Sequence, residues 1–449
     1  MAGVIIPGAG RRPVSFVSLA WATSVVVSVV VSVAASGSAV AGERFVYSMG
    51  AAGSVRMTGA YMHFPELDLP LPPADDGLGG SVVRLMLDGG LGRFLDYELN
   101  AFGDLARGSA MGGSFGTAGA VAGPYRSRYL EWDYWDEGAV DGSLGLDRAN
   151  LLFLAEPYEV QIGRFPINYS VTAIFAPNDF FAPFSTTAIN KIYKPGVDAV
   201  HLGVAPGPLS TWSVDAVMGH DTDDDTPSWS HSALLLRAST VRWNVEWAAM
   251  GGKLAQRWVI GGTTQGQLGP VGFRAEGHAG VRDGSRERST DGPGGAEGAE
   301  GAEDSVHGRV VGGLDLPLSW RGAMAGVEYM YVSQGAFVPD DYLARMSTFF
   351  PEEQPFAGRH YGGATFGLEL TPLLRGGVMA LGNLADGSGL LAANLAYSVA
   401  DEADFAMGMF VPWGKRPTGN GGGPDTRPRL RSEFGGMPVV MYLETRFFF

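Results

Sequence analysis

The sequence predicts an all-β fold, a transmembrane antiparallel up-and-down β-barrel with long outer loops. Three observations predict it. Apolar residues recur at every second position in many segments, short connectors alternate with long ones, and the chain ends on an amphipathic segment that closes at Phe449. Alternation with period two is typical of a strand with one apolar and one polar face. After residue 41 no run of about 18 uncharged apolar residues occurs, so no helical membrane span is expected.

The composition excludes several other classes. The 449 residues include 67 Gly and no Cys, and only 18% are charged. The lack of cysteine rules out a disulfide scaffold, a thiolate metal site and a cysteine nucleophile. The formal net charge of −15 argues against nucleic acid as a partner, because sequence-independent binding to nucleic acid requires a basic face.

Residues 1–41 are predicted to be a signal peptide. Arg11 and Arg12 precede a mostly apolar stretch, and Ala39-Val40-Ala41 provides a small-residue cleavage site. An uncleaved anchor helix is the alternative. The predicted barrel domain is 42–449, placed in the outer membrane of a Gram-negative bacterium after export through the inner membrane, with outer-membrane lipid as its surroundings.

The connectors give the predicted architecture its orientation. Short turns are expected at 156–157, 206–208, 317–319 and 400–402, and long stretches at 65–80, 104–127, 165–195, 219–231, 282–307, 334–360 and 413–435. Bacterial outer-membrane barrels have short periplasmic turns and long outer loops. At roughly 22 residues per strand and connector the length predicts about 18 strands, within a range of 16–20. The acidic segment 282–307, with its repeated Gly-Ala-Glu, is predicted to be disordered.

The strand parity is regular when it is followed backward from Phe449 as far as Asp147. Upstream, four candidate strands at 54–64, 82–88, 93–102 and 128–135 leave one strand too many or too few. Bacterial barrels have an even number of strands. Either another strand lies in 104–127 or one of the four candidates is not a membrane strand.

The C-terminus is the most specific local feature. From Val439 to Phe449, apolar residues alternate with Tyr442, Glu444 and Arg446. This segment resembles the terminal strand of outer-membrane barrels, in which the final aromatic residue is read by the barrel-insertion machinery. The resemblance implies that Phe449 is an assembly signal and that this machinery is a partner.

Further segments resemble a poorly characterised porin-like family of bacterial outer-membrane β-barrels, broadly similar to the alginate-export type. They lie at 146–154, 161–164, 176–184 and 193–200, with a second block at 386–391 and 395–398. The resemblance implies a solute-conducting barrel. Phe165, Tyr169 and Ser170 depart from the family's pattern, so no specific solute is implied.

The stretch 165–195 is too apolar for a long loop in water, and long loops of this kind are usually functional. We expect it to fold into the lumen and narrow the channel. The alternative is a lid on the outer rim or a contact with a neighbouring barrel. The predicted pore and constriction residues are Arg164, Asn178, Asp179, Asn190, Lys191 and Lys194.

Polar positions of the strands are expected to face the lumen. The predicted lumen-facing residues are Glu98, Arg148, Arg242, Glu246, Arg274, Glu276, Glu369, Glu444 and Arg446. Acids outnumber bases on the predicted inner wall and in the long loops, and carboxylate rings favour cations, so a weak cation preference is expected.

No enzymatic function is expected. The segment Gly112–Gly116 matches the nucleophile-elbow pattern around Ser114, but it has no strand before it and no helix after it. The seven histidines are scattered, and no catalytic residue, metal or cofactor is predicted. The function expected is a porin-like channel for passive passage of small hydrophilic solutes of unknown identity. The alternative is a surface adhesion or structural barrel with a plugged lumen.

Overall fold

The computed structural model describes residues 47–65, 75–108, 123–184, 193–221, 223–282, 306–346, 354–418 and 429–449. The predicted signal peptide, residues 1–41, lies outside the described residues. So do residues 283–305 of the acidic segment and Ser114.

Nineteen strands occur in these ranges, and all belong to one antiparallel sheet. They are β1 (Tyr47–His63), β2 (Asp75–Leu91), β3 (Leu95–Arg107), β4 (Glu131–Glu137), β5 (Val140–Ala155), β6 (Tyr158–Phe165), β7 (Val197–Gly207), β8 (Ser210–Val217), β9 (Ala233–Arg242), β10 (Val245–Leu254), β11 (Arg257–Leu268), β12 (Val271–Arg282), β13 (His307–Pro317), β14 (Met324–Val332), β15 (His360–Thr371), β16 (Leu374–Asn383), β17 (Gly389–Ala400), β18 (Ala403–Trp413) and β19 (Val439–Phe448).

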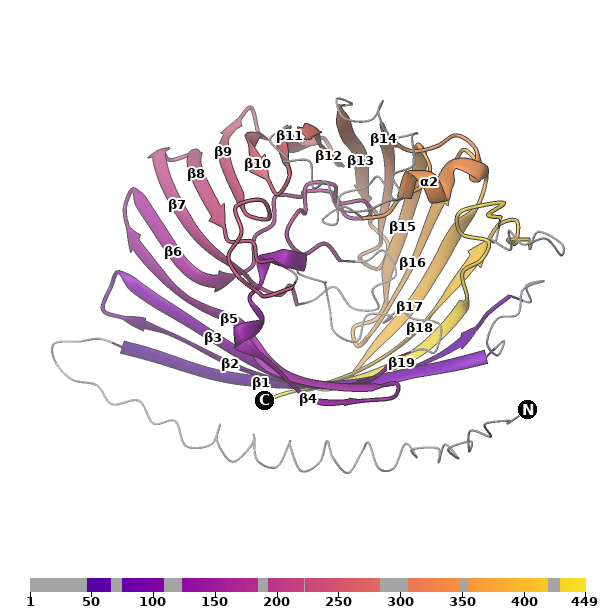
Figure 1. Ribbon diagram of the computed structural model, residues 1–449, viewed down its shortest axis with the longest axis horizontal. Coiled ribbons are helices and arrows are strands. Elements are labelled where there is room, and N and C mark those ends of the chain that lie inside the picture. The colour runs from indigo at the N-terminus through magenta and orange to yellow at the C-terminus, as the bar shows by residue number, and fades with distance from the viewer. Residues whose placement is uncertain are drawn as a thin grey trace, which may run out of the picture.

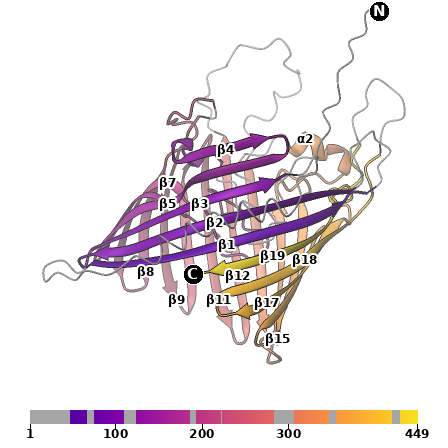
Figure 2. The same cartoon turned by 90° about the horizontal axis from the view of Figure 1, so that it is seen from below.

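The sheet closes on itself. β19 pairs with β1 from Ser54↔Phe448 to His63↔Val439, and every other strand of the ring pairs with its neighbours in sequence, β3 with β5 included. The ring therefore has eighteen strands, and the predicted antiparallel barrel is confirmed. Figure 1 shows the ring of strands around its interior. Figure 2 shows that β1 to β3 are strongly inclined relative to β11 and β12 on the opposite wall.

The remaining strand, β4, explains the break in strand parity. It pairs with the outer half of β5, from Glu131↔Gly145 to Glu137↔Val140. The other half of β5 pairs with β6, from Ala149↔Arg164 onward. Because β3 already pairs along β5, β4 lies outside the ring as a rim hairpin. The candidate strand at 128–135 is therefore the one that does not belong to the barrel wall.

The two ends of the barrel differ in their connectors as predicted. Two-residue turns join β5 to β6, β7 to β8, β9 to β10, β11 to β12, β15 to β16 and β17 to β18, at the end that also holds Phe449. The opposite end carries the long connectors. Two connections there are shorter than expected: residues 255–256 between β10 and β11, and 384–388 between β16 and β17.

The last residue seals the seam between the first and last strands. Phe449 and Gly53 exchange backbone hydrogen bonds of 2.7 and 3.0 Å. The Phe449 ring packs with Val55 and Val83. A Cβ at Gly53 would lie 2.2 Å from this ring, so the ring takes the space that a side chain at position 53 would need.

The wall is apolar outside and polar inside. Trp212, Leu236, Ile260 and Val327 are more than half exposed on the outer face, where lipid would cover them. Buried polar residues include Asn150, Asp215, Glu276, Glu328 and Glu444. The longest helix in the described ranges is α2 (Tyr342–Met346), and no helix there is long and apolar enough to cross a membrane.

Candidate channel lumen and constriction

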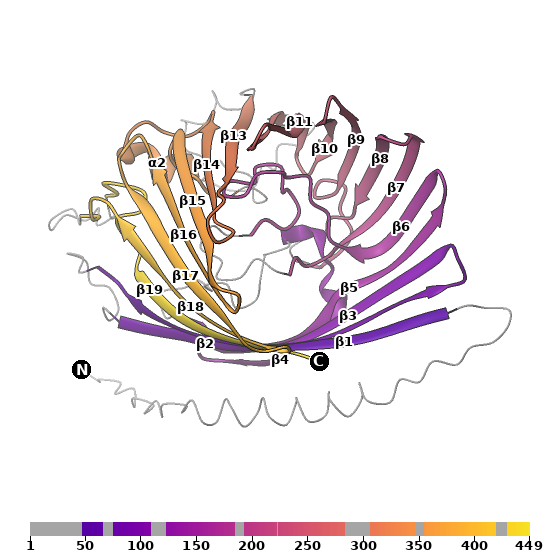
Figure 3. The same ribbon diagram turned by 180° about the vertical axis from the view of Figure 1, so that it is seen from behind.

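Residues 166–184, which follow β6, run inside the barrel. Figures 1 and 3 both show this segment within the ring after it leaves β6. Most of its side chains are buried or half-buried. Tyr169, Phe180 and Phe181 pack in a cluster with Leu235 and Leu254 of β9 and β10.

The middle of this segment packs on a different part of the wall. Ile174 and Phe175 belong to a second buried cluster with Met330 of β14, Tyr361 of β15 and Leu381 of β16. Segment 166–184 therefore bridges two parts of the inner wall. That residues 165–195 narrow a channel stays a prediction.

Two carboxylates of the wall hold the segment between its clusters. Glu276 of β12 accepts hydrogen bonds from Ser170 Oγ (2.5 Å), the Val171 amide (2.6 Å) and Thr172 Oγ1 (2.6 Å).

Glu328 of β14 accepts hydrogen bonds from the next three backbone amides, of Ala173 (2.6 Å), Ile174 (2.9 Å) and Phe175 (3.2 Å). Glu276 was predicted to face the lumen, whereas Glu328 was not predicted. A lone acid between apolar neighbours in a strand was the available signal, because such a residue must face away from lipid.

Three of the predicted constriction residues, Asn178, Asp179 and Lys194, hold this fold in place. Asn178 is fully buried, and its Nδ2 donates to the Gly262 carbonyl at 3.2 Å. His278 Nδ1 lies 3.1 Å from the Asn178 amide oxygen. Asp179 is buried and forms an ion pair with Lys194, and burial raises the pKa of Asp179 and lowers that of Lys194. Asn190 and Lys191 lie outside the described residues.

Arg164 is also engaged within the protein. Its guanidinium donates to the two Asp198 carboxylate oxygens at 2.7 and 2.9 Å, and to the carbonyls of Leu146 (3.0 Å) and Ser127 (2.8 Å). Its exposed fraction is 1%. Arg164 thus ties β6 to β5, β7 and the rim, rather than offering a charge to the passage.

A further contact anchors the chain just before β7. The ring of Tyr193 lies under the guanidinium groups of Arg84 (3.7 Å to the centroid) and Arg148 (4.5 Å). Asn100 donates to the Tyr193 hydroxyl at 3.0 Å. Tyr193 belongs to the apolar stretch 165–195, and no role was predicted for it.

Most predicted lumen-facing charges are paired with charges on neighbouring strands. Glu98 accepts from Arg148 at 2.9 Å. Further pairs across strands are Arg237 with Glu246 (3.2 Å), Arg274 with Asp315 (2.5 Å) and Arg56 with Glu444 (4.0 Å). Glu444 also pairs with Arg446 of its own strand. The bases Arg56, Arg84, Arg126 and Arg237 were not predicted as inner charges, and neither were the acids Asp147, Asp315 and Glu328. The interior therefore holds more charges of both signs than expected.

Two predicted lumen residues lie near the ends of strands. Glu369 is exposed beside Arg375, 3.9 Å away, close to the β15–β16 turn. The prediction for Arg242 was wrong. Trp243 and Asn244 form a two-residue turn with positive φ (56° and 58°), so Arg242 pairs with Val245 on the outer face. Simple alternation through the turn would place Arg242 on the same face as Glu246. The two-residue turn instead places Arg242 on the face of Val245, opposite to Glu246.

No group of three or more His, Asp or Glu side chains able to hold a metal ion occurs in the part of the chain that the structure describes. The polar groups that line the interior are distributed along many strands. This arrangement serves to keep an aqueous surface on the inner wall.

Comparison with known proteins relates the fold to outer-membrane channels. No protein-family model and no curated protein matches the sequence. Crystal structures from Pseudomonas aeruginosa do match. OccK9 (OpdG) has a TM-score of 0.54 at 10% identity, covering 89% of this chain and 98% of that chain.

OccK2 (OpdF), crystallised with glucuronate, has a TM-score of 0.53 at 10% identity, with coverage of 89% and 97%. OccK5 (OpdH) has a TM-score of 0.50 at 10% identity, with the same coverage. The similarity shows an all-β, closed eighteen-stranded fold like that of these structures. The resemblance to the alginate-export type stays a prediction.

Proposed function

We propose that this chain is an outer-membrane channel for the passive passage of small hydrophilic solutes. The main observation in support is a closed eighteen-stranded wall that is polar inside, with a segment folded into the interior between two parts of that wall. A barrel of this size leaves an interior that only water, a plug or a folded segment can fill. The similarity in fold to the Occ channels supports the proposal.

Segment 166–184 is the proposed constriction. It occupies part of the interior and is fixed to the wall by Glu276 and Glu328. The predicted residues Asn178, Asp179, Lys194 and Arg164 act as supports for this segment. The solute would pass between the segment and the part of the wall that it leaves free.

We retain the weak cation preference as part of the proposal. The pairing of wall charges leaves little local excess of either sign, and the negative field comes mainly from the chain's net charge of −15. Such a field is screened within about 10 Å at 0.1 M salt. The preference should therefore be small and should fade as ionic strength rises.

A barrel with a plugged lumen is the second candidate. The observation in its favour is that segment 166–184 is packed into two apolar clusters, as a plug would be.

Liposome swelling separates the two candidates. Liposomes containing the purified barrel should swell in neutral sugars of small size and stop swelling above a sharp size limit. A protein that gives no swelling with any sugar, while it migrates on gels as a folded barrel, is the plugged form.

A further inference from the structure

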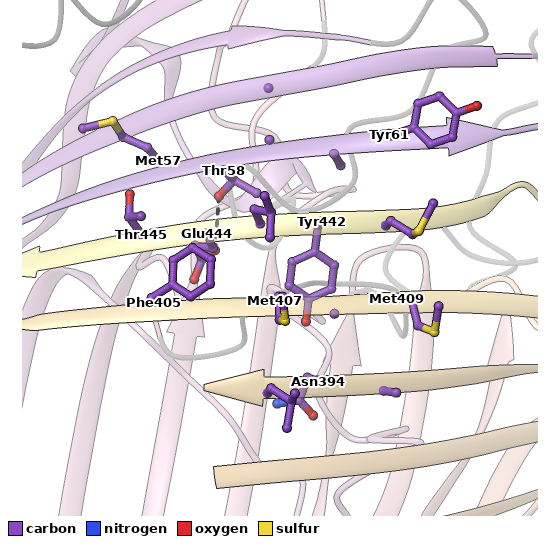
Figure 4. A pocket seen from close by; sticks show the side chains of 18 of the residues that line it. Met57, Thr58, Tyr61, Asn394, Phe405, Met407, Met409, Tyr442, Glu444 and Thr445 are labelled. Carbon is purple, nitrogen blue, oxygen red and sulfur yellow. Dashed lines mark hydrogen bonds between the residues drawn. The ribbon is translucent and has the colours of Figure 1, made fainter. Parts of the chain in front are cut away.

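The outer face of the barrel carries a concave apolar groove of about 1200 Å³. It extends over β15 to β19, β1 and β2, and it reaches Arg107 of β3. The apolar side chains that line it are Met57, Phe366, Leu368, Leu395, Phe405, Met407, Met409, Met441 and Leu443. Figure 4 shows Met57, Phe405, Met407 and Met409 among the side chains at this groove.

The strand register places the groove on the membrane side of the wall. Thr58 faces the lumen, where its hydroxyl donates to buried Glu444 at 3.1 Å. Side chains alternate along a strand, so Met57, Gly59 and Tyr61 face outward. Gly59 pairs with Gly79, and Gly79 pairs with Arg107, so these residues share the outer face.

The floor of the groove has no side chains at three outward positions, which are Gly59 of β1 and Gly77 and Gly79 of β2. The backbone does not require glycine at Gly77 or Gly79. A Cβ at Gly77 would meet one backbone oxygen at 3.7 Å, and a Cβ at Gly79 one at 3.4 Å. Neither position has a positive φ. The hollow is therefore a feature of side-chain choice that larger residues could fill.

The charge at one end identifies the occupant. Arg107 ends β3 at the outer-loop end of the barrel and is exposed, next to the strip formed by Gly77 and Gly79. Tyr61, on the other side of that strip, is also exposed and donates to Asp75 at 2.6 Å. An amphiphile with an anionic headgroup at Arg107 and acyl chains in the groove matches both the charge and the apolar lining.

We propose that this groove binds an acylated, phosphate-bearing lipid of the outer leaflet, of the lipid A type, with its phosphate at Arg107. A second barrel would bring an apolar wall to the groove but no anionic group to Arg107, so it matches the lining and leaves the charge unmatched. Flexible methionines line the groove and adapt to the shape of acyl chains. The inference is independent of whether the lumen conducts solute.

The test is native mass spectrometry of the full-length mature barrel in mild detergent, titrated with lipid A and, separately, with phosphatidylcholine. The wild type should retain one discrete lipid A after the general lipid shell is stripped. Gly77→Leu and Gly79→Leu fill the floor and should weaken retention by about tenfold. Arg107→Gln should lower retention of lipid A a few-fold and leave phosphatidylcholine unchanged.

Ala238→Leu is the matched control, since Ala238 is exposed on the outer face of β9, away from the groove. It should retain lipid A like the wild type. The proposal is overturned if the wild type retains no lipid A, if the glycine variants retain it unchanged, or if Ala238→Leu loses it equally. A dimer of the wild type that the glycine variants convert to monomer would assign the groove to a second copy instead. Heat-dependent gel migration verifies that each variant is folded.

Discussion

At the scale of single residues, position in the barrel decides whether a charge supports the fold or faces the passage. Arg164 and Arg242 are both arginines in strands of the wall. Arg164 is buried with its donors bound to Asp198 and two carbonyls, whereas Arg242 is exposed beside Trp243 at a turn, with its guanidinium 4.4 Å from the Trp243 ring centroid. These surroundings predict opposite sensitivities to substitution.

Arg164→Met should destabilise the barrel by about 3 kcal/mol, because it removes the buried guanidinium from the partly buried Asp198 carboxylate and leaves that carboxylate with the Ser127 amide. Arg242→Met should change stability by less than about 1 kcal/mol. Denaturant unfolding of the refolded barrel in detergent, followed by tryptophan fluorescence, measures both. Equal effects of the two substitutions would contradict the structural role of Arg164.

Phe449 and Gly53 give a second prediction at this scale. Gly53→Ala forces the Phe449 ring to move, because the new Cβ would lie 2.2 Å from it, and should destabilise the closed barrel by about 1–3 kcal/mol. Gly79→Ala, where the nearest atom is 3.4 Å away, is the matched control and should be tolerated. Deleting Phe449 should lower assembly into the outer membrane. Full assembly without Phe449 would argue against the insertion signal.

At the scale of elements, the decisive feature is how segment 166–184 is fixed to the wall. Six hydrogen bonds from residues 170–175 converge on Glu276 and Glu328. Hydrogen bonds to charged groups contribute about 1.5–3 kcal/mol each. The two carboxylates are therefore expected to be the main polar attachment of the middle of the segment.

The double variant Glu276→Gln, Glu328→Gln should loosen the segment and raise both the mean and the fluctuation of single-channel conductance. Glu246→Gln is its control, because Glu246 is paired with Arg237 and Gln265 and has no hydrogen bond to the segment among the described contacts. Conductance traces of the double variant that match the wild type would show that the carboxylates do not position the constriction.

Much of the arrangement of the strands was predictable from the sequence, and the exceptions have physical reasons. Period-two alternation indicated the strands, and connector length indicated their direction. The role of β4 depended on pairing, because the outer half of β5 bonds to it while the other half bonds to β6. The composition of 165–195 predicted an inward fold, but the contacts of residues 173–175 with Glu328, and of Tyr193 with Arg84 and Arg148, depend on which strands face each other across the interior.

At the scale of the whole molecule, charge acts in two ways. Opposite charges on the inner wall pair locally, and the net negative charge of the chain sets the overall field. Sequence patterns alone suggested an acidic inner wall, but inward charges of both signs were not recognised, among them the bases Arg84 and Arg237 and the acids Asp147 and Glu328. Which charges pair across strands depends on the strand register. The hydrophobic pattern fixes the face on which a side chain lies, but it leaves registers that differ by two residues equally possible. Ion selectivity should therefore be weak.

The reversal potential under a KCl gradient should indicate a small cation preference that declines as mean salt concentration rises, because screening shortens the reach of the net negative charge. Measurements at several mean concentrations with a fixed ratio test this. An anion-selective reversal potential would reject the preference, and it would indicate that basic groups such as Arg148 and Arg84 dominate the passage.

The most direct test of the account is single-channel recording of the mature barrel beside a variant that lacks residues 172–190. If the segment narrows an open channel, the wild type gives discrete conductance steps. The deletion should give larger steps, because removing the segment from a wide lumen leaves water in its place. Gel migration before and after boiling verifies that both barrels are folded. A folded wild type that does not conduct, or a deletion with unchanged conductance, would contradict the central claim that this segment narrows an open channel.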